Sequence, residues 1–358
     1  MPFISLCMIV RNEEAVLGRC LDSVADLVDE IILADTGSTD RTKAIAAEYA
    51  AKVYDFPWCD DFSAARNFAV SQAVGDYWMW LDADDVVEGD NHEKLRKILE
   101  HPDADMVYLP YWLSFSPDGT PQTISRRERI FRRERGYRFT GAVHEAVIPS
   151  GICRDGDAAV SHRKLRPSDP DRNLHIYQQK LMRGEPFSPR EQYYYARELW
   201  DHGAYRAALP ILEHFLDEEK GWAPDLVGAC LLCGRCRRKL GQPKKALHRL
   251  FCSFAYGIPH PEICCEIGSI LLESRQYSDA AFWYHLAMDS STQPQEGFWR
   301  QECCDYLPAI QLCVCYDRMG DILKAAAYNE LAGSFRPGDE AVAYNRRYFA
   351  EKANPQTP

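Results

Sequence analysis

Residues 77–85 read YWMWLDADD, an apolar run that ends directly in acidic side chains. Five apolar residues in succession are typical of a strand buried on both faces, as in a parallel sheet covered by helices. Asp82, Asp84 and Asp85 come at the end of that strand, and ligands in open α/β sheets bind beyond the carboxyl ends of the strands. Carboxylate oxygens at such a place can bind a divalent cation. An alternative role for Asp85 or Asp90 is to cap a helix expected over residues 91–99.

The sequence before this run alternates between strand and helix patterns. We expect strands at 3–10, 30–34 and 52–55, and helices at 13–25, 40–51 and 62–73. This alternation predicts an α/β domain with a mostly parallel, Rossmann-like sheet and helices on both faces. Polar groups follow the first two strands at residues 11–13 and 35–38, as they follow the strand at 77–81. The three groups should therefore converge on one edge of the sheet.

The second half of the chain has a different pattern. The polar segment HRKLRPSDPDRN, residues 162–173, contains two prolines and predicts a connector. We place the domain boundary there, giving an α/β domain at 1–166 and an all-α domain at 167–358. A five-residue offset recurs beyond it, at Gly203/Ala208, Gly241/Ala246 and Gly320/Ala325, with Arg275/Ala280 in the same offset. The spacing of these units is close to the 34 residues of tetratricopeptide helix pairs, which stack into a concave surface. A helical cap that only stabilises the first domain is the alternative.

Composition excludes some classes of protein. The formal net charge of −11 argues against general nucleic-acid binding, which needs a basic surface. The first residues lack the basic start of a signal peptide, and no apolar run is long enough to span a bilayer. We therefore expect a cytoplasmic protein with no integral membrane segment. The 14 cysteines then favour reduced, buried thiols over disulfides or a metal cluster.

Several side chains are candidates for binding an anionic ligand. Asp35 follows the second strand and could accept a hydrogen bond from a nucleobase imide, while Ser38 in the same loop could bind ligand or cap the next helix. Arg66 could contact a diphosphate, because guanidinium matches phosphate geometry, or form a salt bridge. Further candidates, or parts of a solvated basic face, are Arg126, Arg129 and Arg132. The dinucleotide fingerprint GxGxxG is absent, which disfavours a nicotinamide enzyme.

Polar residues also interrupt a later apolar segment. His144 and Glu145 fall in a strand expected over 141–147. A carboxylate near a sugar could take a proton from an attacking nucleophile, so Glu145 is the candidate base and His144 would orient it or contact ligand. His162 ends the strand-like AAVSH and could be a metal ligand beside Asp82 and Asp84, or touch phosphate.

The motifs SLCMIVRNEE, ILADTGSTDRT, FSAARNFA, WMWLDADD and GAVHEAV, taken in order, resemble the family 2 glycosyltransferases of the GT-A fold. The added repeats make the chain similar to the subgroup that includes the sublancin S-glycosyltransferase, which modifies a peptide cysteine. The resemblance implies an inverting transfer from a nucleoside-diphosphate sugar, commonly a UDP-sugar, with Mn²⁺ or Mg²⁺.

The resemblance also implies roles for single residues. The first nucleotide-contact loop would contain Asn12, Glu13 and Glu14. Asp35 would recognise uracil, Asp82 would meet ribose or metal beside Ala83, and Asp84 would coordinate the metal. Glu145 falls near the family's catalytic carboxylate, where many members have a glutamate-aspartate pair and this chain has His144-Glu145.

The sequence is less informative about the molecule that would accept the sugar. The repeats and the subgroup favour a peptide or protein side chain. A surface glycan, a lipid-linked saccharide and a non-catalytic peptide-binding adaptor are the alternatives, and the sequence leaves a homo-oligomer open.

Overall fold

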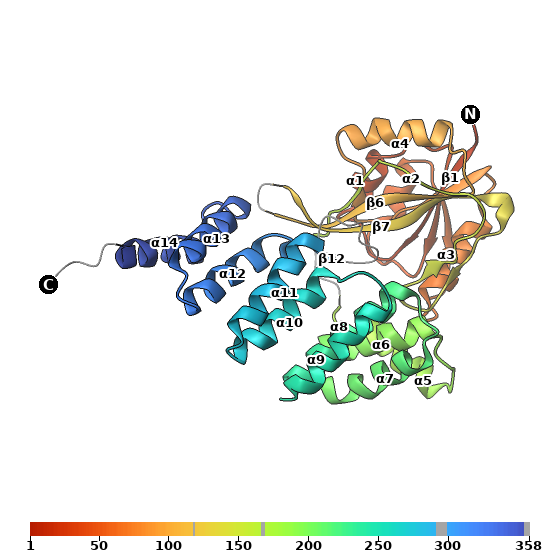
Figure 1. Ribbon diagram of the computed structural model, residues 1–358. Coiled ribbons are helices and arrows are strands. Elements are labelled where there is room, and N and C mark those ends of the chain that lie inside the picture. The colour runs from red at the N-terminus through yellow and green to blue at the C-terminus, as the bar shows by residue number, and fades with distance from the viewer. Residues whose placement is uncertain (117–118, 166–168, 291–298, 354–358) are drawn as a thin grey trace. The chain divides into compact units, whose positions relative to one another are not determined.

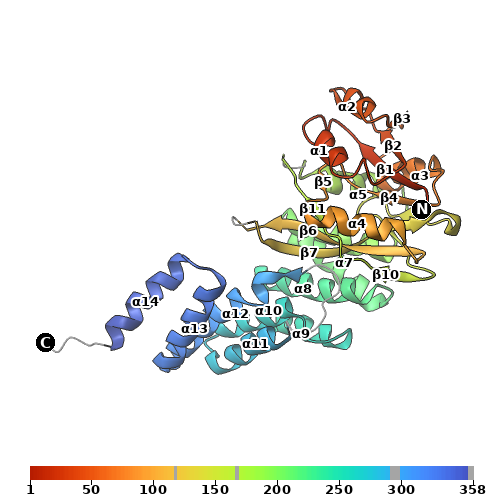
Figure 2. The ribbon, with the colours of Figure 1, turned by 90° about the horizontal axis from the view of Figure 1, so that it is seen from above.

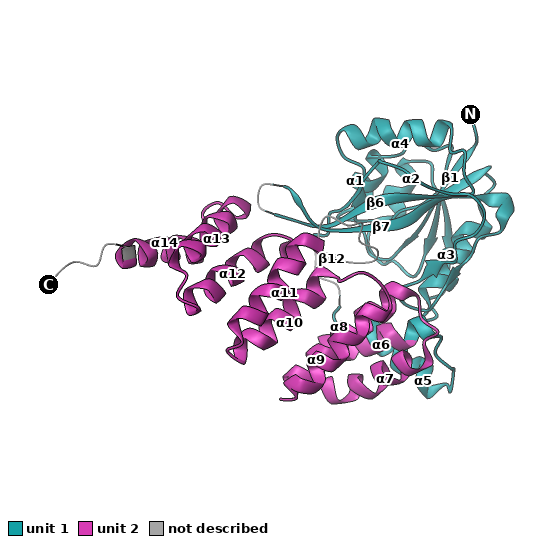
Figure 3. Cartoon of the chain, viewed as in Figure 1, with its two compact units in different colours: residues 1–191 teal, residues 192–358 magenta. Residues whose placement is uncertain are grey.

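The computed structural model describes residues 1–116, 119–165, 169–290 and 299–353 (Figure 1). The chain forms two compact units, Met1–Glu191 and Gln192–Pro358 (Figure 3). The boundary expected between residues 166 and 167 lies outside the described residues. Helix α5 (Arg172–Met182) goes with the first unit, because Tyr177 is fully buried there and Lys180 forms an ion pair with Glu191 at 2.5 Å. Helix α6 (Pro189–Asp201) continues into the second unit.

The first unit is built on one large sheet with strand order β3-β2-β1-β4-β7-β6-β11-β5, and β10 also pairs with β6. The strands are β1 (Ile4–Val10), β2 (Glu30–Asp35), β3 (Lys52–Asp55), β4 (Tyr77–Trp80), β5 (Asp85–Val86), β6 (Met106–Phe115), β7 (Pro121–Arg132), β10 (Cys153–Asp155) and β11 (Val160–His162). Strands β1 to β4 are parallel to one another, and β7 is antiparallel to both β4 and β6. The expected α/β class with a mostly parallel sheet is confirmed.

Helices cover both faces of this sheet (Figures 1 and 2). They are α1 (Leu17–Asp22), α2 (Thr42–Glu48), α3 (Phe62–Ser71) and α4 (Asp90–Glu100). Alternate residues of a strand point to opposite faces. On β1, Leu6 packs in the core beneath α1, α2 and α4, whereas the next residue, Cys7, packs in the core on the α3 side. Nearly every residue of β1 and β2 is buried, which is why these strands read as continuous apolar runs.

The strand expected over residues 141–147 is wrong. Two short antiparallel strands, β8 (Phe139–Thr140) and β9 (Ala146–Val147), flank a turn instead. Gly141 and His144 have φ values of +98° and +53°, in the left-handed region that reverses the chain direction. An apolar run interrupted by such residues is better suited to a turn than to an extended strand.

The second unit is helical in its described part, apart from the short strand β12 (Trp299–Arg300) and 3-10 turns. Its helices are α7 (Tyr205–Glu218), α8 (Ala223–Lys239), α9 (Pro243–Cys252), α10 (Pro261–Glu273), α11 (Tyr277–Ser290), α12 (Tyr306–Arg318), α13 (Ile322–Phe335) and α14 (Glu340–Ala353). Consecutive helices pack side by side (Figure 1).

In each repeat, the first helix of the pair ends in the same kind of turn. At Gly203, which has φ +73°, the backbone N–H donates to the Trp200 carbonyl at 2.9 Å, and the next N–H reaches the Leu199 carbonyl at 2.8 Å. The same two bonds and a positive φ recur at Gly241, Arg275 and Gly320. The alanines at the predicted offset, 208, 246, 280 and 325, are fully buried, so the tetratricopeptide-like repeats are confirmed.

All fourteen cysteines are free thiols, and most are buried. Over the described ranges, the one group of three metal-ligand side chains close enough to share an ion contains no cysteine. Among the described helices, none combines the length and apolarity that a bilayer crossing requires.

Candidate nucleotide and metal site

The loop after β2 presents an unused acceptor. Asp35 is 1% exposed, and its Oδ1 accepts hydrogen bonds from the backbone N–H groups of Gly37 at 2.8 Å and Ser38 at 2.7 Å. Gly37 has φ +106°, which allows this tight turn. The other oxygen, Asp35 Oδ2, is buried and has no hydrogen-bond partner among the described residues. Buried polar atoms are normally satisfied, so this oxygen is suited to a donor on a ligand.

The loops after β1 and β2 are joined by hydrogen bonds. The Asn12 N–H donates to Ser38 Oγ at 2.9 Å, and Asn12 Oδ1 accepts from the Thr39 N–H at 2.8 Å. The Glu14 carboxylate accepts from the Arg41 N–H at 3.1 Å. The predicted contact residues Asn12, Glu14 and Ser38 therefore lie together and hold the two loops side by side.

Glu13 lies between this pair of loops and the acidic loop after β4. Its N–H donates to Thr42 Oγ1 at 2.7 Å. Burial, followed by repulsion from Asp84 and Asp82, raises the pKa of Glu13 to about 7. The three polar groups thus converge on one edge, as the strand order requires.

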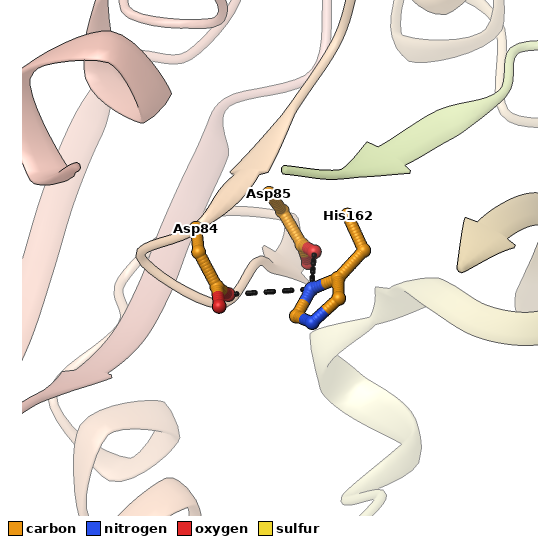
Figure 4. Close-up of side chains that lie close together, drawn as sticks. All are labelled: Asp84, Asp85 and His162. Atoms are coloured by element: carbon orange, nitrogen blue, oxygen red, sulfur yellow. Dashed lines mark hydrogen bonds and ion pairs between the residues drawn. The ribbon is translucent and has the colours of Figure 1, made fainter. Parts of the chain in front are cut away.

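Asp84, Asp85 and His162 form the candidate metal group (Figure 4). Their nearest ligand atoms all lie within 4.8 Å of one another. Both carboxylates approach the same imidazole nitrogen, His162 Nδ1, at 3.4 Å from Asp84 and 3.3 Å from Asp85. The strands explain this placement, because β5 and β11 are antiparallel and pair Asp85 with His162. Two carboxylates and an imidazole are a donor set that fits Mn²⁺ or Mg²⁺.

The side chains of this group shift one another's pKa values. Burial raises the pKa of Asp84, the attraction of His162 opposes that rise, and repulsion from Asp82 and Asp85 adds to it. Burial lowers the pKa of His162, but its hydrogen bond to Asp85 and the attraction of Asp84 outweigh burial and raise it. The raised pKa favours the protonated imidazole beside the two carboxylates, and a cation bound to them would compete with that proton.

Hydrogen bonds and an ion pair to neighbouring groups hold the Asp85 carboxylate in place. Its Oδ1 accepts from Tyr111 Oη at 2.8 Å, and its Oδ2 accepts from the Asp82 N–H at 3.0 Å and pairs with Arg129 Nη1 at 3.0 Å. Asp85 and Arg129 are both fully buried, and the guanidinium lies 4.0 Å from the ring centroid of Trp80. Asp85 does not cap α4, which has no side-chain cap, but supports the acidic loop.

Arg129, predicted as a ligand contact, is placed in the protein core by the structure. Its side chain is fully buried, and its guanidinium carbon lies 4.0 Å from the ring centroid of Trp80 and 4.4 Å from that of Tyr111. The neighbouring candidates Arg126 and Arg132 pair with Asp155 and with Asp105, respectively. Among the ion pairs of the described residues, those of the three arginines include neither Asp84 nor His162.

Asp82 is engaged by an arginine outside the metal group. Its Oδ1 pairs with Arg66 Nη2 at 2.7 Å. Burial alone would raise the pKa of Asp82, but Arg66 and Arg129 lower it to about 2. Of the predicted metal ligands, Asp84 and His162 lie in the candidate group, and the third member of that group is Asp85. The methyl group of Ala83 packs in the core instead of lining the loop surface.

Arg66 links Asp82 to the candidate base. Its Nε bonds Glu145 Oε1 at 2.6 Å, and the guanidinium lies 4.3 Å from the Trp80 ring centroid. His144 precedes Glu145 in the left-handed turn, and its carbonyl accepts from Arg190 Nε at 3.3 Å. Sequence reasoning missed Trp80 and Tyr111, because an aromatic residue in an apolar strand looks like an ordinary core residue.

The chain is similar to known proteins over both of its units. The Glycosyl transferase family 2 model matches residues 5–157. A TPR repeat-containing protein of Synechococcus elongatus is 33% identical over 333 residues, covering 91% of this chain and 76% of the relative. The glycosyltransferase SunS of Bacillus subtilis is 30% identical over 219 residues, covering 55% of this chain and 49% of SunS. The lipopolysaccharide core biosynthesis glycosyltransferase LpsC of Rhizobium meliloti is 29% identical over 160 residues, covering 41% of this chain and 58% of LpsC.

Proposed function

The chain belongs to glycosyl transferase family 2 and carries tetratricopeptide-like repeats, and from that premise we propose that it is an inverting, metal-dependent enzyme that uses a UDP-sugar. The sugar moves to a peptide or protein side chain. The observation that carries the proposal is the convergence of Asp35, with its open Oδ2, and the Asp84–Asp85–His162 group on one edge of the sheet.

Uracil fits the acceptor left on Asp35. An imide N–H is a hydrogen-bond donor, and a buried carboxylate oxygen without a partner is the acceptor it needs. Asn12, Glu13 and Ser38 lie at the joined loops beside it and would contact the rest of the nucleoside. This arrangement supports a uridine nucleotide as the donor.

A divalent cation would be held by Asp84, Asp85 and His162. When bound, it neutralises the charge that develops on the departing diphosphate. The protein's own contribution is to place two carboxylates and an imidazole within reach of one another before the ligand arrives.

Glu145 would act as the base. Its carboxylate is paired with Arg66 and so is held ready to accept a proton from the attacking group. The nucleophile attacks the anomeric carbon on the face opposite the diphosphate, the bond to the diphosphate breaks, and the proton moves to Glu145. A cysteine thiol needs less help from this base than a hydroxyl, because it ionises more readily.

The repeats favour a peptide or protein acceptor. Stacked helix pairs offer an extended surface of the kind that binds peptides. The likeness to SunS agrees with a peptide acceptor, whereas the name of LpsC favours a glycan acceptor as the second candidate. Fourteen free cysteines fit a reduced compartment, so we place the reaction in the cytoplasm.

Titration calorimetry with UDP tests the nucleotide and metal site. We expect UDP to bind more tightly with Mn²⁺ present, and Asp84→Ala to remove that gain while the protein stays folded. Equal affinity with and without Mn²⁺ would contradict metal dependence.

Incubation with a panel of UDP-sugars and a peptide digest, with released UDP measured, then tests turnover. Sugar-dependent release above the Asp84→Ala background rules out the adaptor alternative, and its absence for every sugar would contradict the proposed reaction.

A further inference from the structure

Arg66 has an arrangement that differs from that of a free phosphate-binding arginine. Its side chain is 7% exposed, Glu145 and Asp82 occupy its Nε and Nη2 at 2.6 Å and 2.7 Å, and its buried Nη1 has no hydrogen-bond partner among the described residues. The guanidinium lies 4.3 Å from the ring centroid of Trp80 and 5.6 Å from that of Phe139. Aromatic packing therefore limits its rotation, and the two carboxylates set its direction.

The helix that carries Arg66 also holds the segment that carries Glu145. The Asn67 side chain makes two bonds to the backbone of Phe139, donating to its carbonyl and accepting from its N–H, both at 2.9 Å. The Phe62 N–H donates to the Ala142 carbonyl at 2.9 Å. Together with the bond from Arg66 to Glu145, helix α3 therefore contacts residues 139–145 at three places.

This segment has little regular structure of its own. Strands β8 and β9 have two residues each, and the turn between them contains the left-handed residues Gly141 and His144. Arg127 Nη2 donates to the Glu145 carbonyl at 3.2 Å, which fixes the backbone but not the side chain. The direction of the Glu145 carboxylate is therefore set by its bond to Arg66.

We infer that Arg66 is a positioning residue that, with Asn67, aligns the Glu145 carboxylate with the Asp82–Asp85 loop. The inference rests on the proposed function, in which Glu145 is the base. Because one guanidinium joins both parts, the base and the cation site keep a fixed separation. A displacement of about 1 Å in a reacting group can lower the rate by about 100-fold.

Two other roles make different predictions. An arginine that binds the diphosphate contributes charge-assisted hydrogen bonds to the ligand, so its loss weakens UDP binding by at least about tenfold. An arginine that only stabilises the fold lowers the melting temperature and leaves kcat unchanged. A positioning arginine lowers kcat and leaves the donor KM near its original value.

The test compares Arg66→Met and Arg66→Lys with a matched control, Arg132→Met. Arg132 is also partly covered and pairs with a buried carboxylate, Asp105, at 3.1 Å. It lies at the Tyr77 end of β4, away from the acidic loop at the other end of that strand. Each variant is assayed for UDP release from UDP-glucose, UDP-N-acetylglucosamine and UDP-galactose, with Mn²⁺ and a peptide digest as acceptor.

We expect Arg66→Met to lower kcat by about 100-fold, with the donor KM and the UDP dissociation constant within about threefold of wild type. Millimolar guanidinium should restore at least about a tenth of the lost rate in this variant and none in Arg132→Met, because the added ion can occupy the vacated planar site. If Arg66→Met does not fold, Arg66→Lys decides, since a single Nζ cannot bond both carboxylates in the same geometry and kcat should fall at least about tenfold.

Wild-type kcat in Arg66→Lys, or a tenfold loss of UDP affinity with unchanged kcat in Arg66→Met, would overturn the positioning role. Failure of the wild type to release UDP from any of the three sugars would instead count against the proposed function. The two failures are therefore distinguishable.

Discussion

Replacing Arg129 with methionine should destabilise the first unit severely. Arg129 and Asp85 form an ion pair at 3.0 Å in which both side chains are fully buried. Removing one partner of a buried pair leaves an uncompensated charge, at a cost of about 3–5 kcal/mol. After Arg129→Met, Asp85 keeps the Tyr111 hydroxyl, the Asp82 N–H and His162 Nδ1, which lies 3.3 Å from its Oδ1. Because this imidazole is shared with Asp84, it replaces only part of the lost charge, and we expect a loss at the lower part of that range.

A second substitution separates the charge effect from packing. In the double variant Arg129→Met with Asp85→Asn, both charges are gone and the amide can still accept from Tyr111. We expect it to recover at least about 2 kcal/mol of the loss, because removing both partners is far less costly than removing one. The matched control is Arg126→Met on the same strand, whose pair with Asp155 is 44% and 63% exposed and should contribute less than about 1 kcal/mol.

The assay is urea unfolding followed by tryptophan fluorescence, with the free energy of unfolding taken from the first unit's transition. Arg129→Met within about 1 kcal/mol of wild type, or no recovery in the double variant, would refute the reasoning. A tenfold loss of UDP affinity with unchanged stability would show instead that Arg129 reaches the ligand.

The other predictions concern the acidic loop, the uracil acceptor and the repeats. Asp84→Ala should abolish the Mn²⁺-dependent part of UDP binding and shift the melting temperature by less than about 3 °C, because the side chain is 20% exposed and its raised pKa shows that its charge is not well stabilised in the free protein; loss of folding would contradict this. Asp35→Asn should lower UDP affinity at least about tenfold in calorimetry, since hydrogen bonds to a charged acceptor are the stronger kind; an unchanged affinity would remove Asp35 from the site. Gly268→Ala should cost about 1–3 kcal/mol in urea unfolding, because the new Cβ would lie 2.9 Å from the buried Tyr284 ring; a neutral result would mean that α10 and α11 are not closely packed. Arg275→Gly should raise the stability of the second unit by up to about 1 kcal/mol, because Arg275 adopts φ +61° where the other repeats have glycine; a lower melting temperature would show that its side chain outweighs the backbone strain.

Local pattern was sufficient for the architecture. The apolar run at 77–81 predicts a strand buried on both faces, and strand β4 is buried throughout. The offset from Gly203 to Ala208 predicts a repeat, and it marks the left-handed turn and a fully buried alanine in the helix that follows. These features depend on neighbours a few residues apart, so the order of residues is enough to specify them.

The identity of the groups that face one another depended on strand pairing. Asp82, Asp84 and Asp85 are adjacent acids with no sequence feature to separate them, yet Asp82 meets Arg66 while Asp85 meets His162. The difference arises because β5 pairs with β11, which brings together residues separated by 77 positions along the chain.

The arginines of β7 show the same division. Arg126 and Arg129 belong to one basic run in the sequence, but Arg129 lies beneath the acidic loop and Arg126 is solvent-exposed. The pairing of β7 with β6 shifts its register at residues 128–130, and the placement of β7 between β4 and β6 decides which of its residues are covered. The sequence thus determined the strands, the helices and the kind of chemistry, whereas the tertiary structure decided which charges are buried in pairs and which remain for a ligand, because burial is a property of neighbours that are distant along the chain.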